Sequence, residues 1–143
     1  MRISDILAAK GSEVTTVRRT ATVGDAIAEM ARRSIGALVV SDDGVRIDGI
    51  VSERDIVRRL ATEPEGILDR EVRSIMSYPV HTCSTDDDVE TVMATMTNQR
   101  VRHVPVIDGG RLSGLVSIGD VVKSRIEQLQ HDHKLLVDYI TAR

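Results

Sequence analysis

The sequence has few aromatic residues and a single cysteine. Among its 143 residues tryptophan and phenylalanine are absent, and Tyr78 and Tyr139 are the only tyrosines. With only these two aromatic rings, the chain lacks the stacking platform that many proteins use to bind single-stranded nucleic acid. The single Cys83 excludes an internal disulfide framework and fits the reducing conditions of the cytoplasm. We therefore expect a cytoplasmic protein whose core is built from aliphatic side chains and methionine.

A large net charge and a long apolar run are also missing. The formal net charge is -3, and acidic and basic residues are interspersed along the chain. Proteins that bind nucleic acid depend on neutralising phosphates, so this balance argues against a nucleic-acid partner. No stretch approaches the ~20 apolar residues that a bilayer-spanning helix needs. The first residues, "MRISDILAAKG", also lack the apolar run of a signal peptide, and we expect no membrane partner.

What the sequence does contain is an internal repeat. "GIVSERDIV" at 49–57 and "GLVSIGDVV" at 114–122 share glycine, two apolar residues, serine, aspartate and two further apolar residues in the same order. Ahead of each nonapeptide, at 23–31 and at 89–97, apolar or small residues recur at i, i+3, i+4, i+7 and i+8. That spacing places them on one face of a helix. The same structural unit is thus predicted twice.

Short strands complete each unit. Apolar runs that end in aspartate and glycine, "ALVVSDDG" at 37–44 and "HVPVIDGG" at 103–110, predict strands followed by turns. Each run leads to a return strand and then to a helix that begins at the serine of the nonapeptide. "VTTV" at 14–17 and "VHTC" at 80–83 supply the first strands. Each repeat is therefore predicted to be β-α-β-β-α.

The predicted fold belongs to the α+β class. We assign residues 1–60 to the first repeat, 61–71 to a connector, 72–125 to the second repeat and 126–143 to a C-terminal helix. A unit of about 55 residues buries little apolar surface by itself. We therefore expect the repeats to pack face to face about a pseudo-two-fold axis, with a cleft between them.

The serine and aspartate of the nonapeptide have two interpretations. Ser52 with Asp55, and Ser117 with Asp120, fit a capping box, in which the side chains bond to the backbone at a helix start. Alternatively, each carboxylate could accept hydrogen bonds from both hydroxyls of a ribose, while the helix N-terminus favours a phosphate. The preceding glycine would let a ligand or another backbone approach closely. The sequence leaves both interpretations open.

The tandem nonapeptides, with "HVPVID" ahead of the second, resemble a pair of CBS domains over about residues 1–125. The resemblance implies a non-catalytic, stand-alone regulatory module that binds AMP, ADP or ATP in the cleft, with NAD(H) as a further ligand. It also implies a homodimer, and an effector protein whose identity is unknown. The alternatives are an S-adenosylmethionine sensor and a structural interaction disc with vestigial clefts. An enzyme is disfavoured because no nucleophile and base are recognisable together.

The resemblance also assigns candidate binding residues. Ser52 and Asp55 would hold the ribose in one site, and Ser117 and Asp120 would hold it in the other. The first strand of each repeat would line an adenine pocket, and the apolar residues of each nonapeptide would add contacts. These further candidates are Val14, Thr15, Thr16, Val80, His81, Thr82, Ile50, Val51, Leu115 and Val116, together with Pro105.

The two repeats differ in their basic residues. Arg54 has no counterpart in the second nonapeptide, and Arg100, Arg102 and His103 have none in the first repeat. We expect Arg54 to converge with the other three across the pseudo-two-fold axis and to bind phosphates there. The alternative for Arg100 and Arg102 is a solvated basic rim.

Other clusters predict no further chemistry. His131 and His133 are two residues apart on a predicted helix and face different sides, so we expect no metal site. Acidic residues at 86–88 fit the first turn of a helix, where its dipole favours them. Cys83 could report redox state, but a buried, unreactive thiol is the stronger interpretation.

The C-terminal segment carries an apolar stripe. Its members follow a 4-3-4-3-4 spacing, which is typical of a coiled-coil seam: Val122, Ile126, Leu129, His133, Leu136 and Ile140. The stripe is too short for an independent coiled coil. We expect it to contact a dimer partner, or else to fold back onto its own module.

Overall fold

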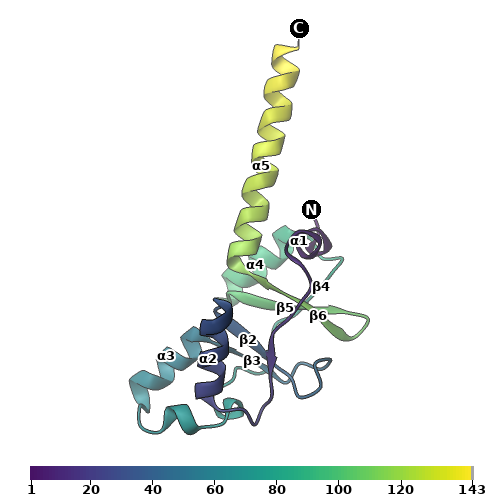
Figure 1. The fold of residues 1–143 in the computed structure, drawn as a ribbon. Coiled ribbons are helices and arrows are strands. Elements are labelled where there is room, and N and C mark those ends of the chain that lie inside the picture. The colour runs from purple at the N-terminus through teal and green to yellow at the C-terminus, as the bar shows by residue number, and fades with distance from the viewer. Residues whose placement is uncertain (143) are drawn as a thin grey trace.

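The computed structural model describes residues 1–142, which form five α-helices and two three-stranded sheets (Figure 1). The first half contains α1 (Ile3–Lys10), β1 (Thr16–Val17), α2 (Val23–Arg33), β2 (Ala37–Val40), β3 (Gly49–Ser52) and α3 (Glu53–Thr62). Two short 3₁₀ helices follow, η1 (Ile67–Asp69) and η2 (Val72–Ser74). The second half contains β4 (Cys83–Ser84), α4 (Val89–Gln99), β5 (His103–Asp108), β6 (Arg111–Ser117) and α5 (Ile118–Thr141). The predicted β-α-β-β-α order is confirmed in both halves.

The two sheets share one topology. In the first, β1 runs parallel to β2, and β2 runs antiparallel to β3. The strands β4, β5 and β6 repeat this arrangement. The hairpin of β5 and β6 is longer than its counterpart, and the Leu112 N–H donates to the Val45 carbonyl oxygen at 2.9 Å. The second hairpin is therefore bonded to the turn of the first.

The central strand of each sheet is buried on both faces. Leu38 and Val40 lie in the apolar cluster beneath the helices of the first half, and Val104 and Val106 lie in the cluster of the second. Successive side chains of a strand point to opposite faces. Pro105 is fully buried, yet it belongs to neither cluster. We conclude that it lies on the opposite face of its sheet, where the two halves meet.

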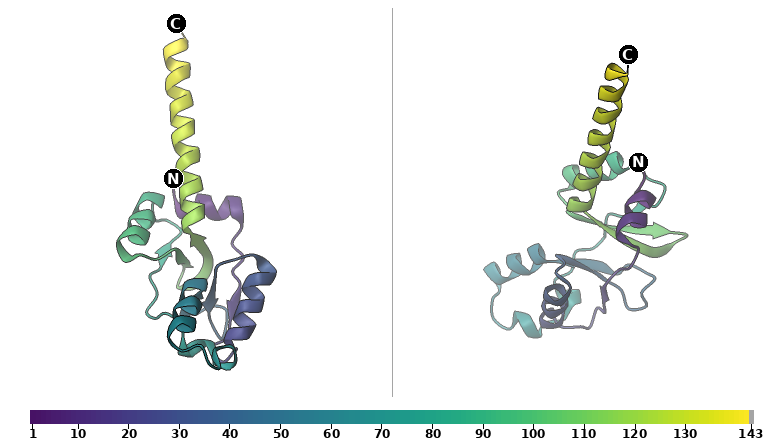
Figure 2. Two further views of the ribbon diagram at one scale, coloured as in Figure 1. Left: turned by 90° about the vertical axis from the view of Figure 1, so that its left-hand side faces the viewer. Right: turned by 45° about the horizontal axis from the view of Figure 1, so that its top comes forward.

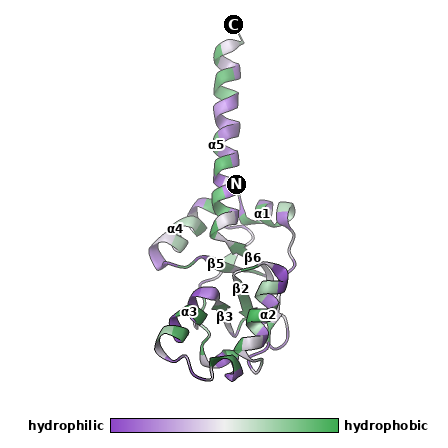
Figure 3. Cartoon of the chain, turned by 60° about the vertical axis from the view of Figure 1, so that its left-hand side comes forward, coloured by the Kyte–Doolittle hydropathy of each residue, from purple (hydrophilic) through white to green (hydrophobic). Residues whose placement is uncertain are grey.

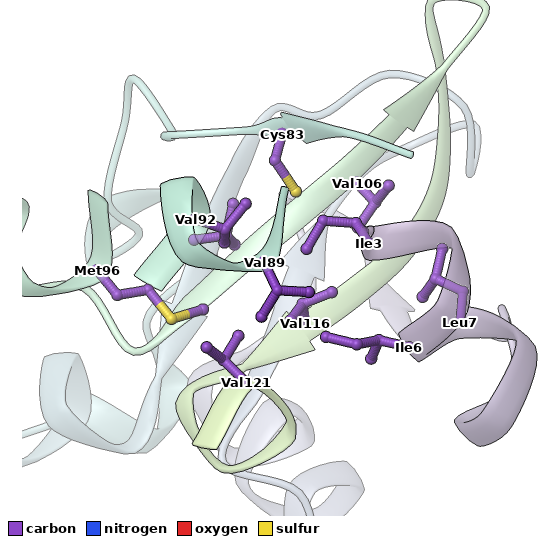
Figure 4. Packing of buried hydrophobic residues seen from close by; sticks show 11 residues of the cluster. Ile3, Ile6, Leu7, Cys83, Val89, Val92, Met96, Val106, Val116 and Val121 are labelled. Carbon is purple, nitrogen blue, oxygen red and sulfur yellow. The ribbon is translucent and has the colours of Figure 1, made fainter. Parts of the chain in front are cut away.

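Each half completes the core of the other with its leading segment. Ile3, Ile6 and Leu7 of α1 pack among Val89 and Val116 of the second half (Figure 4). In return, residues that precede the second half complete the core of the first. They are Ile67, Val72 and Ile75. Each core therefore contains the leading segment of the other half.

Backbone hydrogen bonds hold this exchange in place. The Ile3 N–H donates to the Asp87 carbonyl oxygen at 3.0 Å. In the other core the Val72 N–H donates to the Ala21 carbonyl oxygen at 2.7 Å. Asp87 lies just ahead of α4, and Ala21 lies just ahead of α2. The two exchanges therefore follow the same pattern.

Helix α5 continues far beyond the body of the molecule (Figures 1 and 2). It is one helix of 24 residues, in which the C-terminal helix assigned to 126–143 continues the last helix of the second repeat. Arg143 lies outside the described residues. Only Val121 and Ser124, near its start, are buried. The apolar residues of the stripe are 44–64% exposed. The alternative in which the stripe folds back onto its own module is wrong.

Hydrophobic and hydrophilic residues are interspersed along the projecting part of α5 (Figure 3). Among residues 1–142, no helix combines the length and the apolar character needed to cross a membrane. The same residues contain no group of three or more His, Cys, Asp or Glu side chains placed to hold a metal ion.

Candidate functional site

Both nonapeptides form capping boxes. The Asp55 N–H donates to Ser52 Oγ at 3.3 Å, and the Ser52 N–H donates to Asp55 Oδ2 at 2.9 Å. At the start of α5 the Asp120 N–H donates to Ser117 Oγ at 3.2 Å, and the Ser117 N–H donates to Asp120 Oδ2 at 2.9 Å. In each box one carboxylate oxygen bonds to the backbone. The interpretation as helix caps is therefore correct, and a ligand role has to be compatible with it.

The second oxygen of Asp55 is bonded to a residue of the second repeat. Ser77 donates its hydroxyl to Asp55 Oδ1 at 3.1 Å. The backbone of Ser77 pairs with Ile50, because the Ser77 N–H donates to the Ile50 carbonyl oxygen at 2.8 Å and the Ile50 N–H donates back at 3.1 Å. The carboxylate thus accepts a hydroxyl group already, and a hydroxyl is the group that a ribose would present.

Asp55 lies in a cavity of about 320 Å³ between the two halves. This volume lies at the lower end of the range for small-molecule pockets, about 300–1,000 Å³. Its walls come from β3 and α3 on one side and from the end of α4 and the start of β5 on the other. The lining residues are Gly36, Ile50, Ser52, Glu53, Arg54, Asp55, Arg58, Ser77, Gln99, Arg100, Val101, Arg102 and His103.

The cavity is basic. Four arginines line it, from both halves of the chain, against the two carboxylates of Glu53 and Asp55. Arg54 Nη1 donates to the Arg100 carbonyl oxygen at 3.3 Å, which brings the two halves into contact across the cavity. Guanidinium groups bind phosphate oxygens through paired hydrogen bonds, so this wall can hold an anionic ligand.

His103 also lines this cavity. Burial lowers the pKa of His103 below its usual value, and the opposing charges of Glu53 and Asp120 do not compensate for it. The imidazole is therefore neutral at pH 7. A neutral imidazole can donate one hydrogen bond and accept another.

The second aspartate has a different partner. Lys10 Nζ lies 2.6 Å from Asp120 Oδ2 and donates to the Leu115 carbonyl oxygen at 2.9 Å. Partial burial on its own would raise the pKa of Asp120, but the hydrogen bonds from Lys10 and Ser117 and the charge of Lys10 outweigh it, and the pKa is lowered. Asp120 lines a separate cavity of about 250 Å³ between α1 and α5.

The sequence profile of the CBS domain matches this chain twice, over residues 3–62 and 72–127. The chain belongs to the CBS domain family. A mitochondrial CBS domain-containing protein of Arabidopsis thaliana is 32% identical over 146 residues, which cover 96% of this chain and 71% of that protein. The resemblance that the nonapeptides indicate is thus confirmed.

Solved structures of CBS domain proteins share the fold. A CBS-domain containing protein from Agrobacterium tumefaciens is 40% identical, with a TM-score of 0.84, and the match covers 87% of this chain and 99% of that one. A CBS domain protein from Pyrobaculum aerophilum, complexed with AMP, is 30% identical, with a TM-score of 0.74. That match covers 84% of this chain and 89% of the other.

The CBS pair brings some of the predicted residues to the cavity and leaves others apart. Seven of the candidates line it: Ile50, Ser52, Arg54, Asp55, Arg100, Arg102 and His103. Among the candidates outside its lining are Val14, Thr15, Thr16, Val80, His81, Thr82, Leu115 and Ser117. Val51, Val116 and Pro105 are fully buried and lie outside the cavity lining, so their assignment as ligand contacts stays a prediction. The side chains of Val51 and Val116 point into the two apolar cores, because successive side chains of a strand point to opposite faces.

Sequence reasoning missed several residues of this CBS cavity. Arg58 lies four positions after Arg54 on α3, a spacing that places both on one helix face and could have revealed it. Ser77 carries no such signal, because it reaches Asp55 from the other half of the chain. The remaining missed residues are Gly36, Glu53, Gln99 and Val101.

The glycine of each nonapeptide permits a close approach by the exchanged leading segment. A Cβ at Gly49 would lie 2.6 Å from Met76 Sδ and 3.0 Å from the Ser77 carbonyl oxygen. A Cβ at Gly114 would lie 2.7 Å from Leu7 Cδ2. The expected approach of another backbone therefore occurs at Gly49, whereas a side chain occupies the space at Gly114.

The thiol of Cys83 is part of a core. Cys83 packs in the cluster with α1, and burial raises its pKa to about 12, with a further contribution from the charge of Asp87. A thiol with so high a pKa is almost entirely protonated at neutral pH and is a poor nucleophile. The interpretation as a buried, unreactive thiol fits this environment.

Proposed function

We propose that this CBS pair is a non-catalytic regulatory module that binds an adenine nucleotide, AMP, ADP or ATP, in the cavity at Asp55. The observation that carries the proposal is the combination, in one cavity, of a hydroxyl-accepting carboxylate and four arginines from both repeats. The Pyrobaculum aerophilum relative that was solved with AMP supports the ligand class.

In the proposed complex the ribose hydroxyls bond to Asp55. The capping box uses Oδ2, and Oδ1 accepts from the hydroxyl of Ser77. A ribose hydroxyl can take the place of the Ser77 hydroxyl without leaving a charge unpaired, because one neutral donor replaces another. Helix α3 therefore keeps its cap while the ligand is bound.

The phosphates would bind to the arginine wall. Arg54 and Arg58 approach from the first repeat, and Arg100 and Arg102 approach from the second. This wall disfavours S-adenosylmethionine, because its sulfonium is positively charged. It offers anionic partners for any phosphate, and the cavity of about 320 Å³ favours a mononucleotide over the two nucleosides of NAD(H).

The proposed role is binding and signalling rather than catalysis. Ser52 and Ser77 both donate their hydroxyls to the carboxylate of Asp55, so neither is paired with a histidine base. A phosphate held from both repeats would favour the conformation in which they are close together, which shifts the population of states. A partner protein that distinguishes these states would receive the signal. The cytoplasmic location of this protein stays a prediction.

Isothermal titration calorimetry with AMP, ATP, NADH and S-adenosylmethionine tests the proposal. Asp55→Ala removes a charged acceptor, worth about 1.5–3 kcal/mol, and should weaken AMP binding roughly ten- to hundredfold. Asp25→Ala is the matched control, because Asp25 caps α2 through an equivalent box with Thr22 but lies outside the cavity lining. It should lose stability without losing affinity.

The outcomes separate the candidate functions. Micromolar binding of AMP or ATP that Asp55→Ala weakens ten- to hundredfold supports the nucleotide sensor. The absence of binding by all four compounds would overturn it in favour of an interaction disc with vestigial clefts. Turnover of a bound compound would show an enzyme instead.

A further inference from the structure

Ser77 is bonded to Asp55 at the point where a ribose is proposed to bind. Its hydroxyl donates to Asp55 Oδ1 at 3.1 Å, and among residues 1–142 that oxygen has no other partner. Asp55 Oδ2 accepts the N–H of Ser52 at 2.9 Å and the hydroxyl of Ser52 at 3.0 Å. Both oxygens of the carboxylate are therefore engaged within the chain itself.

The acceptor positions of the carboxylate bring Ser77 into competition with a ribose. An ionised carboxylate has about four lone-pair positions, two on each oxygen. Ser52 uses those of Oδ2, and Ser77 uses one of those of Oδ1. While Ser77 is in place, a single position remains, whereas the two neighbouring hydroxyls of a ribose need two. Both positions of Oδ1 become free when the Ser77 hydroxyl leaves.

The backbone of Ser77 is fixed, and its side chain is free to turn. Ser77 lines the same cavity as Asp55, and its N–H and carbonyl oxygen both pair with Ile50, at 2.8 Å and 3.1 Å. Two residues earlier, Ile75 is buried in the core of the first half. The hydroxyl itself can move from one staggered rotamer to another. It can thus leave Asp55 without any unfolding of the segment that carries it.

The second repeat has no equivalent of this hydroxyl. Met76 lies against the glycine of the first nonapeptide, and Leu7 lies against the glycine of the second, so these two residues are counterparts. The residue that follows is Ser77 in one leading segment and Ala8 in the other. Alanine has no side-chain donor. The competing hydroxyl therefore belongs to the Asp55 site alone and is not part of the repeat.

Given the proposed nucleotide site at Asp55, on which this inference rests, we infer that Ser77 is a built-in competitor of the nucleotide, whose hydroxyl must leave Asp55 before the ribose can bind. The chain that binds the ligand is the one in which the hydroxyl has turned away. The apparent affinity is then the intrinsic affinity reduced by the fraction of chains in that state. Ser77 thereby sets the nucleotide concentration at which the module responds.

Removing the hydroxyl tests the inference. In calorimetric titrations Ser77→Ala should bind AMP about two- to tenfold more tightly than the wild type, because one intramolecular hydrogen bond no longer has to be broken. Ser77→Gly also lacks the hydroxyl and should show a gain of the same sign. 2′,3′-Dideoxyadenosine 5′-monophosphate keeps the phosphate and has no ribose hydroxyls. Its affinity should be the same for the wild type and for Ser77→Ala.

Two further variants make the result specific. Ser74→Ala is the matched control, because the Ser74 hydroxyl donates to the Glu71 carbonyl oxygen at 2.7 Å in the same leading segment but lies outside the cavity lining. It should leave the affinity for AMP unchanged. In an Asp55→Ala background Ser77→Ala should bring no gain, because the hydroxyl then has no carboxylate to occupy. Far-UV circular dichroism and a urea titration show whether each variant folds before its affinity is interpreted.

The possible results separate this inference from the function that it extends. A wild-type chain that binds no nucleotide contradicts the proposed function itself. Folded Ser77→Ala and Ser77→Gly variants that bind AMP no more tightly than the wild type leave that function intact and overturn the competition by Ser77. An equal gain for AMP and for its dideoxy analogue also overturns it, because the gain would then not come from the ribose hydroxyls.

Discussion

The guanidinium of Arg54, at the start of α3, donates a hydrogen bond to the carbonyl oxygen of Arg100, at the end of α4. The bond spans 3.3 Å and joins the two repeats across the basic cavity. Arg100 adopts a left-handed backbone with φ of 54°, which turns the chain from α4 towards β5. A ligand phosphate at this point can contact both repeats at once.

Replacing Arg54 should affect the phosphates and spare the nucleoside. Arg54→Met removes a charged donor, so the affinity for AMP should fall about tenfold or more, whereas that for adenosine should change little. Calorimetry with the two ligands measures the difference. Arg111→Met is the control, because Arg111 is an exposed arginine at the β5–β6 turn outside the cavity lining. Equal losses for AMP and adenosine would contradict the assignment of Arg54 to the phosphate.

His103 should make the stability of the unliganded protein depend on pH. Burial lowers its pKa in the folded state below the value of about 6.5 that it has in the unfolded chain. Below pH 6.5 the unfolded state therefore binds more protons than the folded state. Its contribution to stability is fully present above pH 6.5 and is lost as the pH falls towards the folded-state pKa, by up to about 1.4 kcal/mol per pH unit.

Urea titrations between pH 7.5 and 5.5 measure this loss. The charged groups whose fields reach His103 are Glu53, Asp120, Lys10 and Arg102. His103→Gln removes the titrating group and should flatten the profile, while the three exposed histidines remain as an internal control. An unchanged slope in His103→Gln would show that another group causes the dependence.

The glycines of the nonapeptides should resist substitution for steric reasons. Gly49→Ala and Gly114→Ala would each place a Cβ within 3.0 Å of an atom of the exchanged leading segment. Forcing a methyl group into such a space typically costs about 1–3 kcal/mol of unfolding free energy. The measurement is the midpoint of urea unfolding, which should fall in both variants.

Gly119→Ala is the matched control for this prediction. Gly119 lies in the first turn of α5, and a Cβ there would approach nothing closer than 3.6 Å. Alanine in a helix is favoured over glycine by about 1 kcal/mol, so this variant should be as stable as the wild type or more so. A loss of stability at all three sites would argue against specific contacts with Leu7 and Met76.

We propose that the exposed stripe of α5 is a dimer contact. Leu129 and Leu136 belong to the stripe and are 52% and 61% exposed, whereas Leu135 is 54% exposed and lies off it. The wild type should sediment at twice the mass of the chain. Leu129→Asp/Leu136→Asp should sediment as a monomer, and Leu135→Asp should remain a dimer. A monomeric wild type would contradict the proposal.

The repeating patterns predicted the elements of the fold but not their partners. The helical spacing around Val23 and Val89 identifies the buried faces of α2 and α4, because a face is a local property. Nothing in those patterns indicates that Ile3 packs with Val89 rather than with Val23. The exchange of leading segments depends on the path of the chain between the two halves. The sequence would show the same repeat whether or not the segments were exchanged.

The candidate site was predictable to the same extent. Arg54 and Arg100 stand out because the other repeat lacks them, and such a difference between repeats can be seen in the sequence itself. Lys10 and Ser77 match no motif, and they reach Asp120 and Asp55 from the opposite half of the chain. The structure alone shows which aspartate is engaged by a cation.

The exchange of leading segments makes the CBS pair indivisible. A protease cut in the connector at 63–66 would leave α1 on the first fragment, although α1 is buried in the core of the second. The same cut would leave Val72 and Ile75 on the second fragment, although they are buried in the core of the first. Each fragment would then expose an unfilled apolar groove that only its counterpart fits. Such fragments should reassemble when mixed. Insertions in the connector should be tolerated, because the exchanged leading segments hold the two halves together and the connector does not.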